Sequence, residues 1–193
     1  VAEPVVAITH VTLIDGTGAA PRTDQTVVIR NGRIAAVGPS GSTAVPNGAH
    51  TIEGRGHTVI PGLGGRHDHL FYMAVGGRNV NAQFTSARLY LASGVTTVRT
   101  TGANSAYADI QAKADIDAGR SPGPRIHLTA PYLTGQGFNG DAVMAKADSP
   151  EQARRFVNYW ADAGATWIKA STAITRENLG AAIAAAHRRG LKV

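Results

Sequence analysis

The sequence predicts an α/β protein in which a small β-unit, residues 1–60, precedes a series of parallel βα units, residues 61–193. Two observations lead to this prediction. The first sixty residues are rich in Val, Ile and Thr and are interrupted by Asp-Gly and Asn-Gly turn signals. The remaining residues alternate short apolar runs with helical segments, which is the pattern of parallel βαβ construction.

The first sixty residues contain several strand signals. The stretch EPVVAITHVTLIDGTG begins with strand-forming residues and ends in turn residues. The runs QTVVIR and RIAAVG flank Asn31-Gly32, a dipeptide typical of a type I′ hairpin because both central residues need a positive φ. A further strand pair is expected at Ala49–Glu53 and His57–Ile60, before Pro61-Gly62 interrupts the pattern.

The second part is expected to contain four strand-and-helix units. Strands are predicted at Leu63–Leu70, Gly94–Thr100, Pro124–Ala130 and Ala165–Ser171. Helices are predicted at Asn81–Ala92, Ser105–Ala118, the segment SPEQARRFVNYWADAG from Ser149, and Thr175–Arg189. Ser149, Pro150 and Gln152 form the pattern of a capping box, and Gly119 and Gly190 are typical helix stops.

The four strand-and-helix units are half the number found in a closed (β/α)₈ barrel. A (β/α)₈ barrel has eight strands and roughly 250 residues, so the chain contains either the N-terminal half of such a TIM-like barrel or a smaller open sheet. The apolar run Leu191–Val193 begins a fifth strand. A three-residue parallel strand is a poor place for a sheet to stop, which favours a half barrel truncated at the start of strand five.

Composition narrows the function classes. The formal net charge is +6 at pH 7, but the basic residues are scattered and the few aromatic residues are not interleaved with them. We therefore expect a solvated surface rather than a nucleic-acid interface. No apolar run reaches the roughly 18 residues of a membrane span, and VAEPV has no signal-peptide pattern, so the compartment stays unassigned. The absence of cysteine excludes thiolate metal sites and leaves His, Asp, Glu and Lys as ligands.

His67 and His69 are the candidate metal ligands. Residues two apart in a strand face the same side, so both imidazoles are expected to project together while Asp68 faces away. The alternative is a pair of strand-end histidines that only hydrogen-bond to the backbone. Their position at the end of the first strand of a βα series favours a metal site, because the C-terminal strand ends of such barrels carry the chemistry.

An ordered set of motifs then points to a known family. VTLIDGTG, VIRNGRIAAVG, VIPGL followed by HDHL, LASGVTTVRT, GPRI and WIKAS occur in the order of the amidohydrolase superfamily. The chain resembles most its imidazolonepropionase-like and prolidase-like members, over essentially all 193 residues. The resemblance implies a metal-dependent hydrolase with a barrel and a small flanking β-sandwich that is built from both chain ends.

The resemblance also assigns roles to residues. His67 and His69 match the two strand-one metal ligands, and Lys169 matches a strand-four lysine that many members carry as an N-carboxylated bridge between two metals. It implies one or two divalent ions, zinc first, and a metal-activated water that cleaves amide or peptide-like C–N bonds. Without the resemblance, Lys169 is a solvent-exposed strand-end lysine. The remaining family ligands, on strands five, six and eight, fall outside residues 1–193.

The chain departs from the family pattern at two places. Gly64-Gly65 stand where the family has an apolar residue and an aspartate, which removes a side chain that could orient ligands. Thr100 follows Arg99 where many relatives have an acidic residue. Neither change removes a proposed ligand.

Tyr72, His127 and the segment Leu133–Gly140 are candidate substrate contacts, with ordinary strand or turn residues as the alternative. The expected partners are a small amide or peptide-like substrate, the missing C-terminal half or another chain, and further copies in a homo-oligomer. We expect these 193 residues alone to be inactive as a hydrolase. The rival interpretation is a non-catalytic interaction protein with a decayed site, since a half barrel exposes strand edges.

Overall fold

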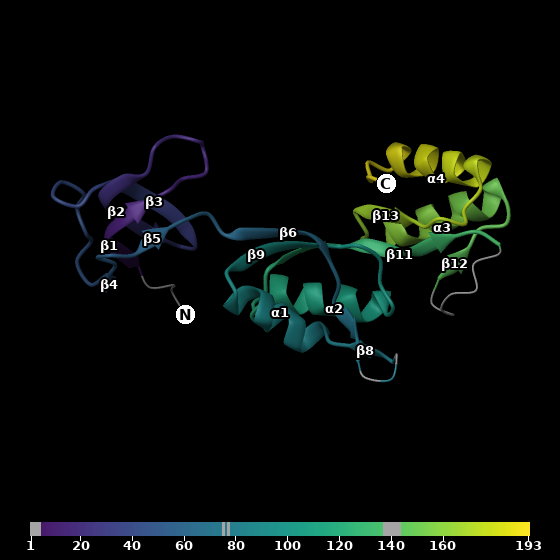
Figure 1. Ribbon diagram of the computed structural model, residues 1–193, viewed down its shortest axis with the longest axis horizontal. Helices are drawn as coiled ribbons and strands as arrows, with labels where there is room; N and C mark the ends of the chain where they lie inside the picture. The colour runs from purple at the N-terminus through teal and green to yellow at the C-terminus, as the bar shows by residue number, and fades with distance from the viewer. Residues whose placement is uncertain (1–4, 75, 77, 137–143) are drawn as a thin grey trace. The chain divides into compact units, whose positions relative to one another are not determined.

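The chain divides into two compact units, Val1–Pro61 and Gly62–Val193 (Figure 1). The computed structural model describes residues 5–74, 76, 78–136 and 144–193. No helix in these ranges has both the length and the apolar character that a membrane crossing requires.

The first unit is a five-stranded sheet in the order β3-β2-β1-β4, with β5 also paired to β1. Its strands are β1 (Val6–Leu13), β2 (Arg22–Arg30), β3 (Arg33–Pro39), β4 (His50–Glu53) and β5 (Thr58–Val59). The predicted hairpin is confirmed, since Asn31 and Gly32 between β2 and β3 have φ values of 52° and 68°. The expected pairing of Ala49–Glu53 with His57–Ile60 was wrong. The strands β4 and β5, which form in these two segments, each pair in parallel with β1 instead.

The strands of this unit bury one cluster of side chains, Val11, Leu13 and Val27. The described residues of this first unit form a single sheet, so the second layer of the expected sandwich stays a prediction.

The second unit contains a series of parallel strands that follow one another in both sequence and space. The principal strands are β6 (Leu63–Asp68), β9 (Val95–Thr100), β10 (Arg125–His127), β11 (Thr129–Thr134) and β13 (Trp167–Ala170). β6 pairs with β9, β9 with β10 and β11 with β13, all in parallel. Lys192 continues the series by pairing in parallel with Trp167. The chain is therefore a mixed α/β protein, and closure into a barrel stays a proposal.

Four helices accompany these strands: α1 (Gln83–Ala92), α2 (Ala106–Asp117), α3 (Pro150–Asp162) and α4 (Arg176–Arg188). The Ser149 hydroxyl accepts a hydrogen bond from the Gln152 N–H at 3.3 Å, as the capping pattern predicts. The Gln152 side chain accepts from the Asp148 N–H at 2.7 Å, so the box closes one residue earlier than expected. Helix α4 is capped by Thr175, which accepts from the Asn178 N–H at 3.2 Å.

Three short strands were not predicted from the sequence. β7 (Phe71–Met73) and β8 (Asn79–Asn81) pair antiparallel, and β12 (Ala145–Lys146) pairs with β11. Because Asn81 pairs with Phe71, α1 begins at Gln83 rather than at the expected Asn81. Elements of two or three residues are too short to show a hydrophobic period.

The two faces of the parallel strands differ. Val98 and Ile126 are buried in a cluster that includes Ile110 and Ile116 of α2, on the side of the strands where Figure 1 shows α1 and α2. Thr97, Arg99 and His127 alternate with them and line an open cavity instead. We call the side with the cavity the concave face and the other the helix face.

Asp109 is a carboxylic acid buried within the second unit. Its side chain, on α2, is only 1% exposed and accepts one hydrogen bond, from Gln83 Nε2 at 2.9 Å. The second oxygen has no hydrogen-bond partner among the described residues. Burial raises the pKa of Asp109 from 3.8 to about 6.

This raised pKa predicts a pH-dependent loss of stability. Native Asp109 holds its proton up to about pH 6, whereas the unfolded chain releases it near pH 3.8. Stability from this group is therefore present below pH 3.8 and is lost as the pH rises toward 6, by about 3 kcal/mol. Urea unfolding should show that, from pH 4 to pH 7, the free energy of unfolding of Asp109→Asn rises relative to that of wild type by about that amount.

The control is Asp148→Asn, at an exposed carboxylate that precedes α3. A comparable gain for Asp148→Asn would assign the effect to the loss of any carboxylate rather than to the buried one. Parallel curves for wild type and Asp109→Asn would contradict the prediction.

Candidate functional site

The two histidines lie side by side where β6 ends. His67 is the fifth residue of β6, and His69 directly follows the strand. Their ring centroids are 5.6 Å apart with the ring planes at 79°, in an edge-to-face arrangement. The His67 residue is exposed and His69 is half-buried.

A β-bulge in β6 determines which face these side chains occupy. Gly65 pairs with Val98, and Asp68 pairs with Thr100, so β6 takes one residue more than β9 over this interval. Val98 and Thr100 are both buried, which places Gly65 and Asp68 together on the helix face. Because successive side chains face opposite sides of a strand, His67, next to Asp68, is assigned to the concave face.

Gly65 provides the space that Asp68 fills. A Cβ built on Gly65 would overlap Asp68 Oδ2 and lie 2.6 Å from its Cγ. Asp68 Oδ2 is buried without a hydrogen-bond partner in the described part of the chain. The glycine that departs from the family pattern therefore accommodates the carboxylate three residues later.

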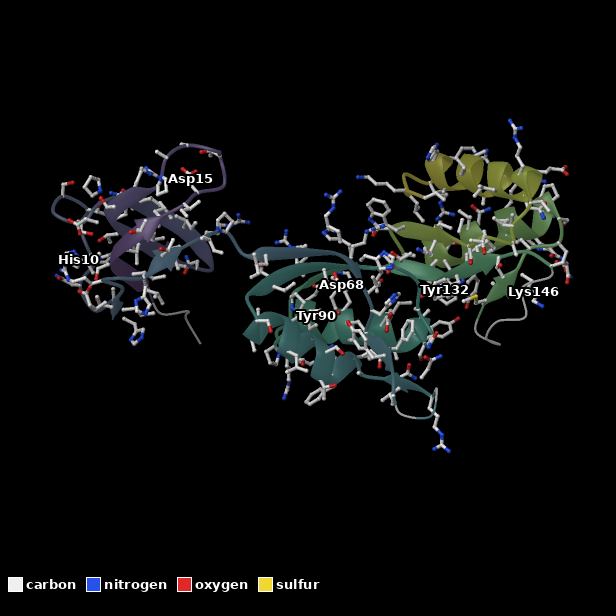
Figure 2. The ribbon with its side chains drawn as sticks, viewed as in Figure 1. His10, Asp15, Asp68, Tyr90, Tyr132 and Lys146 are labelled. Carbon is white, nitrogen blue, oxygen red and sulfur yellow. The ribbon has the colours of Figure 1, made fainter. Side chains whose placement is uncertain are left out.

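Several contacts hold the backbone and ring of His69. Tyr90 Oη donates to the His69 carbonyl at 3.2 Å, and the Thr101 N–H donates to the Asp68 carbonyl at 2.9 Å. The ring of Phe71 lies 4.7 Å from that of His69, centroid to centroid. Burial raises the pKa of Tyr90 above its ordinary value, with the nearby charge of Asp68 contributing (Figure 2), so Tyr90 stays a neutral donor.

Lys169 belongs to the same neighbourhood. Burial lowers the pKa of His69, and the positive charges of His67 and Lys169 lower it further. The protonation of His69 is therefore coupled to the charges of His67 and Lys169, the other two residues singled out in the sequence. The lowered pKa keeps the His69 imidazole neutral at pH 7, which is the form that binds metals.

Tyr132 is a site residue that the sequence patterns missed (Figure 2). It pairs with Lys169 between β11 and β13, and its ring stacks at 29° on His69 with the centroids 6.4 Å apart. The ring also covers Gly102, where a Cβ would lie 2.6 Å from it and φ is +96°. This pairing of a left-handed glycine with an aromatic ring has no local sequence signature.

The candidate substrate contacts are dispersed. Tyr72 contacts the hydroxyl of Tyr90 and lines a cavity of about 290 Å³ beside α1. His127 is exposed and lines a second cavity, of about 590 Å³, whose walls do not include His67, His69 or Lys169. Leu133 is fully buried in the core of β11, so the expected loop Leu133–Gly140 begins as strand; its residues 137–140 lie outside the described residues.

The donor set fits part of a divalent-metal site. The rings of His67 and His69 lie 5.6 Å apart, centroid to centroid, and the charge of Lys169 acts on His69, whereas a tetrahedral zinc site takes four ligands. Within the described ranges, no group of three or more His, Cys, Asp or Glu residues lies close enough to hold a metal ion. Any site based on His67, His69 and Lys169 therefore needs donors from elsewhere.

No protein-family model and no curated protein matches the chain, whereas several solved structures do. A provisionally assigned prolidase from Bifidobacterium longum matches with 31% identity and a TM-score of 0.83, over 98% of this chain and 48% of its own. A phenylurea hydrolase B matches with 26% identity and a TM-score of 0.76, over 97% and 54%. A Xaa-Pro dipeptidase with bound methionine, 23% identical, shares the fold with a TM-score of 0.82, over 97% and 55%. The chain thus spans about half the length of these structures.

The two adjacent glycines of β6 should respond differently to substitution. Gly65→Ala forces the Asp68 carboxylate to move, whereas a Cβ at Gly64 meets no atom within 4 Å. We expect urea unfolding to show a loss of about 1–3 kcal/mol for Gly65→Ala and little loss for Gly64→Ala.

A double-mutant cycle identifies the cause of this loss. In an Asp68→Ala background, Gly65→Ala should cost much less, because the overlapping carboxylate is gone. Equal costs for the two glycines, or an unchanged cost without Asp68, would contradict this explanation.

Proposed function

The chain matches the amino-terminal half of amidohydrolase-superfamily structures, and we propose that it is the metal-binding half of a (β/α)₈-barrel hydrolase that cleaves amide or peptide-like C–N bonds. The matched structures include a prolidase, a Xaa-Pro dipeptidase and a phenylurea hydrolase, which support this substrate class. On this proposal the rest of the barrel, as a further segment or another chain, supplies the remaining ligands. Assembly of the complete protein into a homo-oligomer stays an expectation.

One observation supports the proposal: the rings of His67 and His69 lie side by side where β6 ends, and the charge of Lys169, on the distant strand β13, acts on His69. The imidazoles of His67 and His69 would hold a zinc ion, and Lys169, as its carbamate, would allow a second. A bound zinc ion polarises a carbonyl and lowers the pKa of its water.

The chain's own residues prepare these ligands. Tyr90 donates to the His69 carbonyl and so orients the residue, while Phe71 and Tyr132 flank its ring. Burial and the positive charges nearby keep the imidazole of His69 unprotonated. Lys169 would contribute to a metal site as its carbamate, which forms when an uncharged amine reacts with carbon dioxide.

Zinc binding by the purified chain tests the proposal. Equilibrium dialysis followed by metal analysis should show one saturable zinc per chain, with the affinity at least tenfold lower in His67→Ala and in His69→Ala. His57→Ala is the control, since His57 is an exposed histidine of the first unit. Bicarbonate should strengthen zinc binding by wild type and have no effect on Lys169→Arg.

Two results would contradict the proposal. Absence of bound zinc from a folded sample would favour the rival interpretation, an interaction protein with a decayed site. Equal losses in His57→Ala and His67→Ala would show binding unrelated to the pair. Metal-dependent turnover by the 193-residue chain alone would contradict the narrower claim that its site is incomplete.

A further inference from the structure

The concave face of the second unit carries a strongly basic cavity. Its volume is about 590 Å³, and its walls are the backbone of Gly64 and Gly65 together with Arg66, Thr97, Arg99, His127, Trp167 and Lys192. Three of these side chains are cationic, a fourth is a histidine, and none is acidic. The interior of a closed barrel is ordinarily filled by bulky branched apolar residues, so this lining is unusual for the fold proposed above.

The cationic groups are held in place around one aromatic ring. Arg99 Nε donates to the Arg66 carbonyl at 3.0 Å, which fixes the guanidinium across the sheet. Arg99 Cζ lies 4.5 Å from the centroid of the Trp167 ring, and Lys192 Nζ lies 5.1 Å from it. Two like charges therefore converge on the same indole, and an anion placed beside them would be stabilised by both.

No carboxylate of the described residues neutralises this group. The ion pairs in these ranges involve other residues, and Arg66, Arg99 and Lys192 take part in none of them. The chain as a whole carries a formal charge of +6, so a second copy would bring further positive charge. Charge complementarity therefore favours an acidic partner over self-association through this face.

We propose that the basic cavity is the docking site of an acidic polypeptide segment whose carboxylates pair with Arg99 and Lys192. A polypeptide suits the site better than a free anion, because β6 is the terminal strand of its sheet and offers unpaired backbone groups beside the cavity. A strand added at this edge places alternate side chains over the concave face. The matched structures are also about twice as long as this chain.

The inference rests on the proposed half barrel, for which it specifies the chemistry of the covering segment. It involves none of the proposed metal ligands. Zinc binding and segment docking can therefore fail separately.

A synthetic peptide provides the test. The probe is a capped nonapeptide of alternating Val and Glu, and the matched control replaces Glu with Gln. Trp167 reports binding through its fluorescence in a Trp160→Phe background, which leaves it as the single tryptophan. We expect saturable binding of the Glu peptide only, weakening as salt is raised.

Matched variants locate the site. Arg99→Gln should weaken peptide binding at least fivefold, and Lys192→Gln provides a second, exposed position in case Arg99→Gln fails to fold. Arg155→Gln, at an exposed arginine of α3, should leave the affinity unchanged.

Three outcomes would overturn the proposal. Equal binding of the Gln peptide would remove the role of the carboxylates. Displacement of the Glu peptide by citrate at the same carboxylate concentration would assign the cavity to small anions. An equal loss in Arg155→Gln would show that only the net charge of the chain is involved.

Discussion

The β-bulge between Gly65 and Asp68 is the constraint on which the site depends. Side chains alternate along a regular strand, so an uninterrupted β6 would place His67 on the same face as Gly65, against the helices. The extra residue reverses this alternation and returns Asp68 to the helix face. The rings of His67 and His69 then lie side by side, and the ring of His69 stacks on that of Tyr132.

The bulge also gives the Gly64-Gly65 pair a structural explanation. Seen from sequence alone, two glycines weaken a strand that should hold metal ligands rigidly. In the structure, Gly65 leaves the volume that the Asp68 carboxylate occupies, and Gly64 opens onto the basic cavity. Glycine at position 65 is therefore explained by the Asp68 carboxylate, which fills the space that a side chain at position 65 would need.

Local signals in the sequence were sufficient for elements whose cause is local. The Asn31-Gly32 turn, the Ser149 and Thr175 caps and the stop at Gly190 each follow from one or two residues. The bulge, the position of Tyr132 and the cavity around His127 depend instead on which strands pair and in what register. Register is a tertiary property, so periodicity within a single strand could not reveal it.

The two ends of the concave face are electrostatically related. Arg66, Arg99 and Lys192 gather positive charge on the face that also presents the histidine pair, and a divalent cation at that pair would add charge of the same sign. The described residues that line the basic cavity include no carboxylate. A segment that brings carboxylates to the basic cavity would lower this repulsion and so increase the affinity of the histidine pair for metal. Completion of the fold and retention of the metal are thus expected to be coupled through charge, without direct contact between the two sites.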